Sequence, residues 1–426
     1  MTRPTFLELQ PDWYELADGE RCWLDVSERS VQLAGIDADA DADEGSGLLK
    51  VEVHAPPSSH FELELSTGAP PPASSSQTPH FVEIVRRERD WIEVHAHVGE
   101  QSARRTVRTV FQAPAAAVAV AGRRQLLAVD VSRDERVVAV GGADGHCAIF
   151  DALARTEAFN LPGHFSDVTS VRFFPSSKVL LSASLDFTLR IWNVEDGLCA
   201  AVLKGHRGGV EDTAILGRGR NDVIAKWGND AQSAVHCLSV LDDASKALGK
   251  AGDEPPAAHS QEAETEGKVL FAGLENGETL GVDIRMRQLT ASVRGTAPIL
   301  SCAATSTSGA PLLFTGSEDG ILATWDLRHT STPLQLQTRS GAPIHSIALS
   351  SETGDAPSAA ASVWTAHGDG VCCHWSGAAT DALVSTELSG PQFDPVRGLA
   401  IAPRTGRVFT VGRDGLLRDY NPHLLT

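Results

Sequence analysis

The sequence predicts an all-β fold: a seven-bladed β-propeller over residues 111–426, preceded by a small, mostly-β N-terminal domain over residues 1–110. Two observations predict it. A Gly-His pair at Gly163-His164 recurs at Gly205-His206, with strand-like runs between the two pairs. Short turns built on Asp or Asn then recur in phase along the rest of the chain. A repeat of roughly 40–45 residues is typical of one four-stranded propeller blade.

The recurring turns set the register of the blades. Asp or Asn suits such a turn because its side chain can cap backbone amides, and a following Gly supplies a positive φ. The turns are centred on Asp144, Asp186, Asp230, Asn276, Asp319, Asp369 and Asp414. At a constant distance after them stand Phe150, Trp192, His236, Val282, Trp325, Trp375 and Tyr420. Seven turns in phase, most followed by an aromatic residue, predict seven blades.

One blade carries a complete set of the polar residues that fasten a WD-type repeat. These residues are His164, Ser182, Asp186 and Trp192. A buried Asp is costly unless it accepts several hydrogen bonds, so we expect the four side chains to form one network. The alternative is that Ser, His and Asp perform nucleophilic catalysis. The regular repeat explains the same residues without catalysis and favours the structural interpretation.

The ring is predicted to close by joining the two ends of the chain. The sequence stops soon after Tyr420, so the last blade needs an outer strand from Thr106–Phe111 or Ala115–Ala121. The third blade is the weakest, because Lys226 and His236 stand at its Ser/Thr and Trp positions. The stretch 241–267 that follows is polar and poor in strand-forming residues.

Residues 1–110 lack the repeat and contain short runs of alternating apolar and polar residues. Such runs predict half-buried strands. Two segments between them, 37–47 and 66–80, are acidic or rich in Pro and Ser, and we expect mobile loops there. The acidic run lacks the Gly and the closing Glu of an EF-hand loop, which favours a loop over a calcium site.

Charge and cysteine content restrict the partners and the compartment. The net charge of −19 argues against non-specific binding to nucleic acid or anionic membranes and leaves room for a basic protein partner. Simple solubility is the alternative explanation of that charge. The 7 cysteines are scattered without a CxxC pair, which favours a reducing compartment. We expect neither a signal peptide nor a membrane span.

The sequence favours a non-catalytic protein without a metal or cofactor. Cys372-Cys373-His374 resembles a metal cluster, but neighbouring side chains on a strand point to opposite faces. No Gly-rich phosphate loop followed by Lys and Ser or Thr is present. The histidines stand at repeat positions or singly, whereas an enzyme would gather such groups in one site.

Several stretches are more particular than a generic WD repeat. They include Gly163-His-Phe-Ser-Asp-Val168, Arg172-Phe-Phe-Pro175, Lys204–Ile215, Arg218–Asn221, Thr265–Lys268, Gly316–Gly320 and Asp326-Leu-Arg328. With these stretches the chain resembles the WD-repeat proteasomal ATPase-associated factor family, whose fungal members are assembly chaperones of the proteasome regulatory particle. The third blade departs from the family pattern, because Lys226-Trp-Gly-Asn-Asp230 replaces the expected turn.

The resemblance implies a chaperone that holds the C-terminal domain of a proteasomal ATPase subunit while the regulatory-particle base assembles. It implies a monomer before complex formation, in the cytoplasm and nucleus. Binding hot spots tend to be aromatic or charged, so the candidate contacts are loop residues Asp167, Glu211, Asp212, Trp227, Glu318 and Arg413. The alternative for each is a structural cap or a solvated charge. The alternative for the whole chain is a generic WD-repeat scaffold or a ubiquitin-ligase adaptor.

Overall fold

The computed structural model describes residues 5–15, 21–28, 30–33, 51–54, 59–64, 80–87, 90–98, 105–120, 122, 124–216, 233–242, 267–286, 288–307, 310–350, 362–376, 383–391 and 393–422. Nearly all of its elements are strands, as the sequence predicts. The two helices are single 3-10 turns, η1 (Trp13–Glu15) and η2 (Ala143–Gly145). No helix among these residues is long and apolar enough to cross a membrane.

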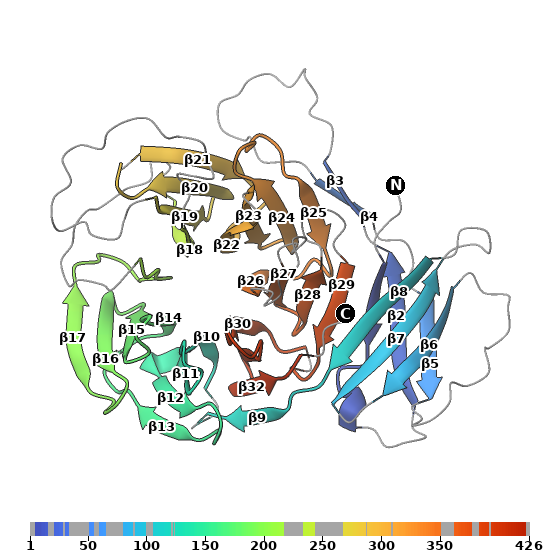
Figure 1. Cartoon of the computed structure of the whole chain (residues 1–426), viewed down its shortest axis with the longest axis horizontal. Helices are drawn as coiled ribbons and strands as arrows, with labels where there is room; N and C mark the ends of the chain where they lie inside the picture. Colours follow the sequence, from blue (N-terminus) through green and yellow to red (C-terminus); the bar gives the residue numbers. More distant parts are fainter. Residues whose placement is uncertain are drawn as a thin grey trace.

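Six four-stranded antiparallel blades surround a central axis (Figure 1). The first three blades are β10 (Leu126–Val131), β11 (Val137–Gly142), β12 (Cys147–Asp151) and β13 (Glu157–Asn160); β14 (Val168–Phe173), β15 (Val179–Ser184), β16 (Thr188–Asn193) and β17 (Cys199–Lys204); and β18 (Val235–Leu241), β19 (Val269–Leu274), β20 (Glu278–Asp283) and β21 (Gln288–Arg294). The next are β22 (Ile299–Thr307), β23 (Ala310–Ser317), β24 (Ile321–Asp326) and β25 (Gln335–Thr338); β26 (Ile344–Ser350), β27 (Ser362–His367), β28 (Cys372–Ser376) and β29 (Leu383–Leu388); and β30 (Val396–Ile401), β31 (Val408–Gly412), β32 (Leu416–Tyr420) and β9 (Ala116–Ala119).

Burial follows the position of a strand within its blade. The second strands, such as β15 and β27, are buried along almost their whole length, because neighbouring blades cover both of their faces. This is why their sequences read as short apolar runs instead of alternating. The outer strands β13 and β17 are mostly exposed. The core therefore lies between adjacent blades.

The ring closes between the two ends of the propeller. β9 pairs antiparallel with β32, from Ala119 opposite Leu416 to Ala116 opposite Asp419. The strand expected from Ala115–Ala121 is thus confirmed, and this pairing covers an edge that β32 would otherwise expose. The other candidate, Thr106–Phe111, lies instead in β8 (Arg105–Gln112), which pairs parallel with β29.

The prediction of seven blades is wrong for the part of the chain that the structure describes, which forms six. The turn at Asp230 and the residues Lys226 and Trp227 lie outside the described residues, as do 243–266. His236 was expected to end the third strand of the third blade, but it lies in β18, the inner strand of the blade that carries the Asn276 turn. The expected third blade depended on Asp230 at its turn position and on His236 where most other blades have an aromatic residue. These two residues are not enough to predict a blade.

An irregular segment, residues 205–216, lies between the inner strands β14 and β18. The Asp212 carboxylate accepts hydrogen bonds from Ser170 Oγ in β14 (3.0 Å) and from the Leu238 amide in β18 (2.9 Å). Ser170 Oγ also lies 2.8 Å from Thr213 Oγ1, and the Val210 and Thr213 side chains are buried. The segment therefore links the two inner strands without forming a sheet of its own.

The N-terminal strands form two small sheets and an extension of one blade. They are β1 (Thr5–Leu9), β2 (Arg21–Glu28), β3 (Ser30–Leu33), β4 (Val51–His54), β5 (Ser59–Glu64), β6 (His80–Arg87), β7 (Trp91–Val98) and β8. A three-stranded sheet has the order β1-β2-β5, and β3 and β4 form a two-stranded sheet. Through the parallel pairing of β8 with β29, strands β6 to β8 extend the fifth blade to seven strands. The expected domain boundary at 110/111 falls inside β8. The expected mobile loops, 37–47 and all of 66–80 but His80, lie outside the described residues.

A buried ion network joins the N-terminal strands to the ring. Arg339, just after β25, donates to both carboxylate oxygens of Glu387 in β29 at 2.9–3.2 Å and to Glu8 in β1 at 3.1 Å. Close by, Trp13 Nε1–H donates to Ser389 Oγ at 3.0 Å. Arg339, Glu387 and Trp13 are buried, so the Arg339–Glu387 pair is shielded from water, whereas the Glu8 side chain is 28% exposed.

Candidate protein-binding face

One face of the ring carries the turns between the second and third strands of every blade. In the second blade Val168 at the start of β14 lies opposite Ser184 at the end of β15. Thr188 at the start of β16 likewise lies opposite Lys204 at the end of β17. The connections that enter the inner strands therefore share this face with those turns. We call it the turn face; it comprises 143–145, 185–187, 275–277, 318–320, 368–370 and 413–415 with the segments before each inner strand.

The four predicted fastening residues lie together behind the turn face. Trp192 Nε1–H donates to Ser182 Oγ (2.8 Å), and Ser182 Oγ lies 2.8 Å from His164 Nε2. His164 Nδ1 lies 2.8 Å from Asp186 Oδ2. Asp186 also accepts from the Thr188 amide (2.9 Å), the Thr188 hydroxyl (2.6 Å) and the Phe165 amide (3.1 Å). A side chain from the connection before β14 is thereby tied to both middle strands of the blade.

The protonation states follow from these bonds. Burial would raise the pKa of Asp186, but the hydrogen bonds from Thr188, His164 and Phe165 outweigh it and lower the pKa to about 2. Burial lowers the pKa of His164 despite the neighbouring Asp186 carboxylate. A neutral His164 donates from Nδ1 to Asp186 and accepts the Ser182 hydroxyl proton at Nε2. Every member of the network then has a partner.

The same geometry argues against nucleophilic catalysis. Ser182 is fully buried, and its hydroxyl receives the Trp192 N–H. A nucleophile must meet its substrate within about 3–3.5 Å, which a sealed hydroxyl cannot do. Trp325 with Thr315 (3.1 Å) and Trp375 with Thr365 (2.8 Å) repeat the indole-to-hydroxyl bond in other blades. The bond is therefore a feature of the blade.

The structure places four of the six candidate contacts on the turn face. Glu211, Glu318 and Arg413 are exposed there; Asp167 is half-buried, and its carboxylate accepts a hydrogen bond from the Asp144 amide (3.1 Å). Trp227 lies outside the described residues. The Asp212 carboxylate is hydrogen-bonded to β14 and β18 and lies 3.5 Å from Arg172 Nη2. These contacts hold the side chain within the fold. Its structural interpretation is the better one.

Sequence reasoning missed three exposed phenylalanines on the turn face. The exposed fractions of Phe165, Phe187 and Phe393 are 88%, 48% and 67%. Phe165 and Phe187 lie beside one another, because the Phe165 amide binds the carboxylate of Asp186. Phe187 has a φ of 70° where the matching turns place Gly145, Gly277, Gly320, Gly370 and Gly415. A Phe at a turn position where other blades have Gly was the sequence signal that could have identified this site, since a bulky residue is rarely found at positive φ.

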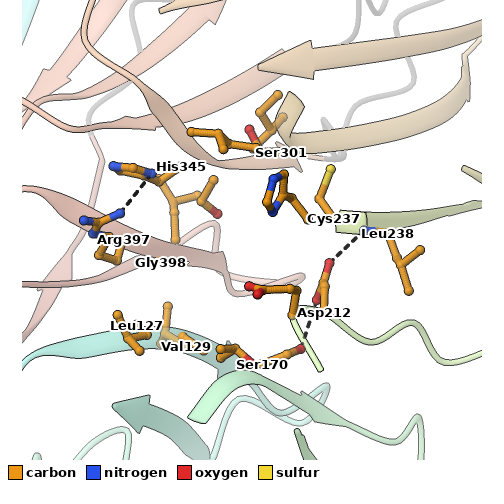
Figure 2. A pocket seen from close by; sticks show the side chains of 18 of the residues that line it. Leu127, Val129, Ser170, Asp212, Cys237, Leu238, Ser301, His345, Arg397 and Gly398 are labelled. Atoms are coloured by element: carbon orange, nitrogen blue, oxygen red, sulfur yellow. Dashed lines mark hydrogen bonds between the residues drawn. The ribbon is translucent and has the colours of Figure 1, made fainter. Parts of the chain in front are cut away.

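The inner strands enclose a cavity of about 130 Å³ on the ring axis. Figure 2 shows His345 and Arg397 on one side of it and Asp212, hydrogen-bonded to Ser170 and Leu238, on the other. Arg397 Nη1–H donates to His345 Nδ1 at 3.3 Å. The cavity is small and polar, which suits a few water molecules or one side chain better than a large ligand.

Cys372, Cys373 and His374, the run that resembles a metal cluster in the sequence, are buried in β28. Both thiols are buried, and burial raises their pKa values, so thiolates are disfavoured. His374 is instead hydrogen-bonded to Ser385 Oγ (2.6 Å) and to Ser362 Oγ. Across the described residues, no three His, Cys, Asp or Glu side chains are grouped as metal ligands.

Known proteins share the repeat. The family model of the WD domain, G-beta repeat, matches residues 155–193, which contain the Ser182–Trp192 bond. This stretch of the chain is therefore similar to a WD repeat. The 26S proteasome regulatory subunit RPN14 of Saccharomyces cerevisiae is 28% identical to it over 249 residues, which cover 53% of this chain and 59% of RPN14. Proteasomal ATPase-associated factor 1 of Gallus gallus is 30% identical over 169 residues, 40% of this chain and 39% of the relative.

These two relatives confirm the resemblance of this chain to the proteasomal ATPase-associated factor family. The chain is also similar to a differently named protein. Pre-mRNA-processing factor 19 homolog 2 of Arabidopsis thaliana is 29% identical over 210 residues, 48% of this chain and 38% of the relative. In all three cases the match spans less than two thirds of the relative's own length.

Proposed function

We propose that this protein is a non-catalytic chaperone for assembly of the base of the proteasome regulatory particle, acting in the cytoplasm and nucleus. It holds the C-terminal domain of one ATPase subunit on its turn face and enters that complex as a monomer. The names of two relatives, a 26S proteasome regulatory subunit and a proteasomal ATPase-associated factor, support the choice of partner.

The observation that carries the binding role is the exposed pair Phe165 and Phe187. Interface hot spots are enriched in aromatic residues that lose their water on binding, surrounded by a polar rim. Here Asp167 and Glu211 supply acidic groups on the same face. In a chain with a net charge of −19, such a rim favours a basic partner domain and speeds its association.

Removing the aromatic pair is expected to weaken the complex. Phe165→Ala combined with Phe187→Asn should raise the Kd for the ATPase domain at least about thirtyfold, which is about 2 kcal/mol. Asn is chosen at 187 because it tolerates positive φ. Isothermal titration calorimetry with the purified domain measures the change.

The matched control lies on the opposite face of the same two blades. Leu153 and Leu198 are 87% and 66% exposed in the turns between third and outer strands. Leu153→Ala with Leu198→Ala should leave the Kd unchanged. Equal losses in both double variants, or no loss in either, would contradict binding through the turn face.

The second candidate is a generic WD-repeat scaffold or ubiquitin-ligase adaptor. The similarity to pre-mRNA-processing factor 19 homolog 2 favours it over 48% of this chain, against 53% for the 26S proteasome regulatory subunit RPN14. The two candidates differ in partner: a scaffold of this kind would bind its target through the turn face and ignore the ATPase domains.

A further inference from the structure

The cavity on the ring axis has an opening built by one repeated backbone feature. In all six inner strands the register with the second strand slips at the same place, between the first and third residues. Such a bulge re-aims the side chain of the extra residue. The bulged residues are Leu127, Thr169, His236, Leu300, His345 and Arg397, and all of them line the cavity. Because inner strands begin at the turn face, these residues surround the opening on that side.

Arg397 is the bulged residue with unused hydrogen-bonding capacity. A guanidinium only donates, so the contact of its Nη1 with His345 Nδ1 (3.3 Å) makes that ring nitrogen the acceptor. The proton of neutral His345 then resides on Nε2, which becomes a further donor at the opening. Arg397 Nε is buried and has no hydrogen-bond partner among the described residues. Within those residues no carboxylate pairs with Arg397 either.

A second cation lies beside Arg397. The Arg413 amide donates to the Pro395 carbonyl (3.0 Å), which brings the turn after β31 against the start of β30. Burial lowers the pKa of Arg397, and the nearby Arg413 lowers it further. Asp212 across the cavity is already bonded to Ser170 and Leu238 (Figure 2). Glu211 also lines the cavity, but among the described residues neither Arg397 nor Arg413 forms an ion pair with a carboxylate.

We propose that the opening of the axial cavity is a carboxylate-binding site, with Arg397 and Arg413 as the charge partners and His345 as a neutral donor. Arginine suits a carboxylate because its fork can form two parallel hydrogen bonds. The cavity of about 130 Å³ equals roughly four waters at about 30 Å³ each, which is room for one carboxylate group entering from the turn face. The carboxylate belongs to a partner protein, as an Asp or Glu side chain or as a chain terminus. This site does not depend on which protein the turn face binds.

Three short N-acetylated peptides test the site in the full chain by calorimetry. One is N-acetylated, C-amidated Ala-Glu-Ala; the second is the same peptide with Gln; the third is N-acetylated Ala-Ala-Ala with a free carboxyl end. At least one carboxylate peptide should bind ten times or more tighter than the Gln peptide. The Glu peptide and the free-end peptide distinguish a side chain from a chain terminus as the source.

Variants of Arg397 and Arg413 test whether these two side chains bind the carboxylate. Arg397→Gln should weaken carboxylate binding at least tenfold, and Arg413→Gln should weaken it less because that side chain is more exposed. Arg404→Gln, an exposed arginine in the turn between β30 and β31 on the opposite face, is the control and should change nothing. Thermal melting verifies that each variant folds, with Arg397→Lys as the replacement that keeps the charge. The proposal is overturned if neither carboxylate peptide exceeds the Gln peptide, or if Arg397→Gln binds like the unaltered protein.

Discussion

Replacing Arg339 by Ala is expected to lower the free energy of unfolding by roughly 3–5 kcal/mol. The guanidinium is buried and holds both Glu387 and Glu8. Burial alone would lower the pKa of Arg339, but the two carboxylates raise it, so the side chain stays charged. Its removal leaves Glu387 buried without a counter-charge. Urea denaturation at neutral pH measures the change.

Two further variants separate this effect from a loss of charge in general. Arg136→Ala removes an exposed arginine 3.8 Å from Asp134 and should cost less than about 1 kcal/mol. Arg339→Met combined with Glu387→Gln removes both buried charges and should recover part of the loss. A cost for Arg339→Ala no larger than that for Arg136→Ala would show that the network does not join the N-terminal strands to the ring.

Asp186→Ala is the second change with a large expected effect, a destabilisation of about 2–4 kcal/mol. The substitution removes the acceptor of the His164 ring, the Thr188 amide and hydroxyl, and the Phe165 amide. His164 is buried and would be left with an unsatisfied donor. Asp319→Ala, at the same turn position of another blade, is the matched control. The Asp319 side chain accepts from Ser317 Oγ, so we expect a cost below about 1 kcal/mol.

The pH dependence gives the Asp186 prediction a specific signature. The pKa is about 2 in the folded protein against the usual 3.8, so the ionised carboxylate contributes its full stability above the unfolded value. That contribution is lost as the pH falls from about 4 to 2. The stability gap between the unaltered protein and Asp186→Ala should therefore narrow across this window. A gap that stays constant from pH 6 to pH 2 would contradict the depressed pKa.

The blades could be predicted from the sequence where an Asp turn, a Ser or Thr before it and a Trp after it recur at the same spacing. Ser182 with Trp192, Thr315 with Trp325, and Thr365 with Trp375 are hydrogen-bonded pairs whose spacing is fixed by two paired strands. The closing strand was predictable for a related reason, because an unpaired edge strand must find a partner. The predicted number of blades was wrong because the third blade was predicted from Asp230 and His236 alone.

Other features depend on contacts that a single sequence does not encode locally. The parallel pairing of β8 with β29 joins segments far apart in the chain. The bulges at His345 and Arg397 are backbone slips between strands and have no residue signature of their own. Phe187 is different, because a Phe in a turn where other blades place Gly was visible in the sequence. Its exposure, and the neighbouring position of Phe165, required the fold.

The central claim is that the turn face holds the C-terminal domain of a proteasomal ATPase subunit. The most direct measurement is a pulldown of each purified ATPase C-terminal domain by the full chain, at low and at raised salt. The account predicts that one domain is retained at low salt and that retention weakens as salt screens the acidic rim. Retention of no ATPase domain at low salt would contradict it.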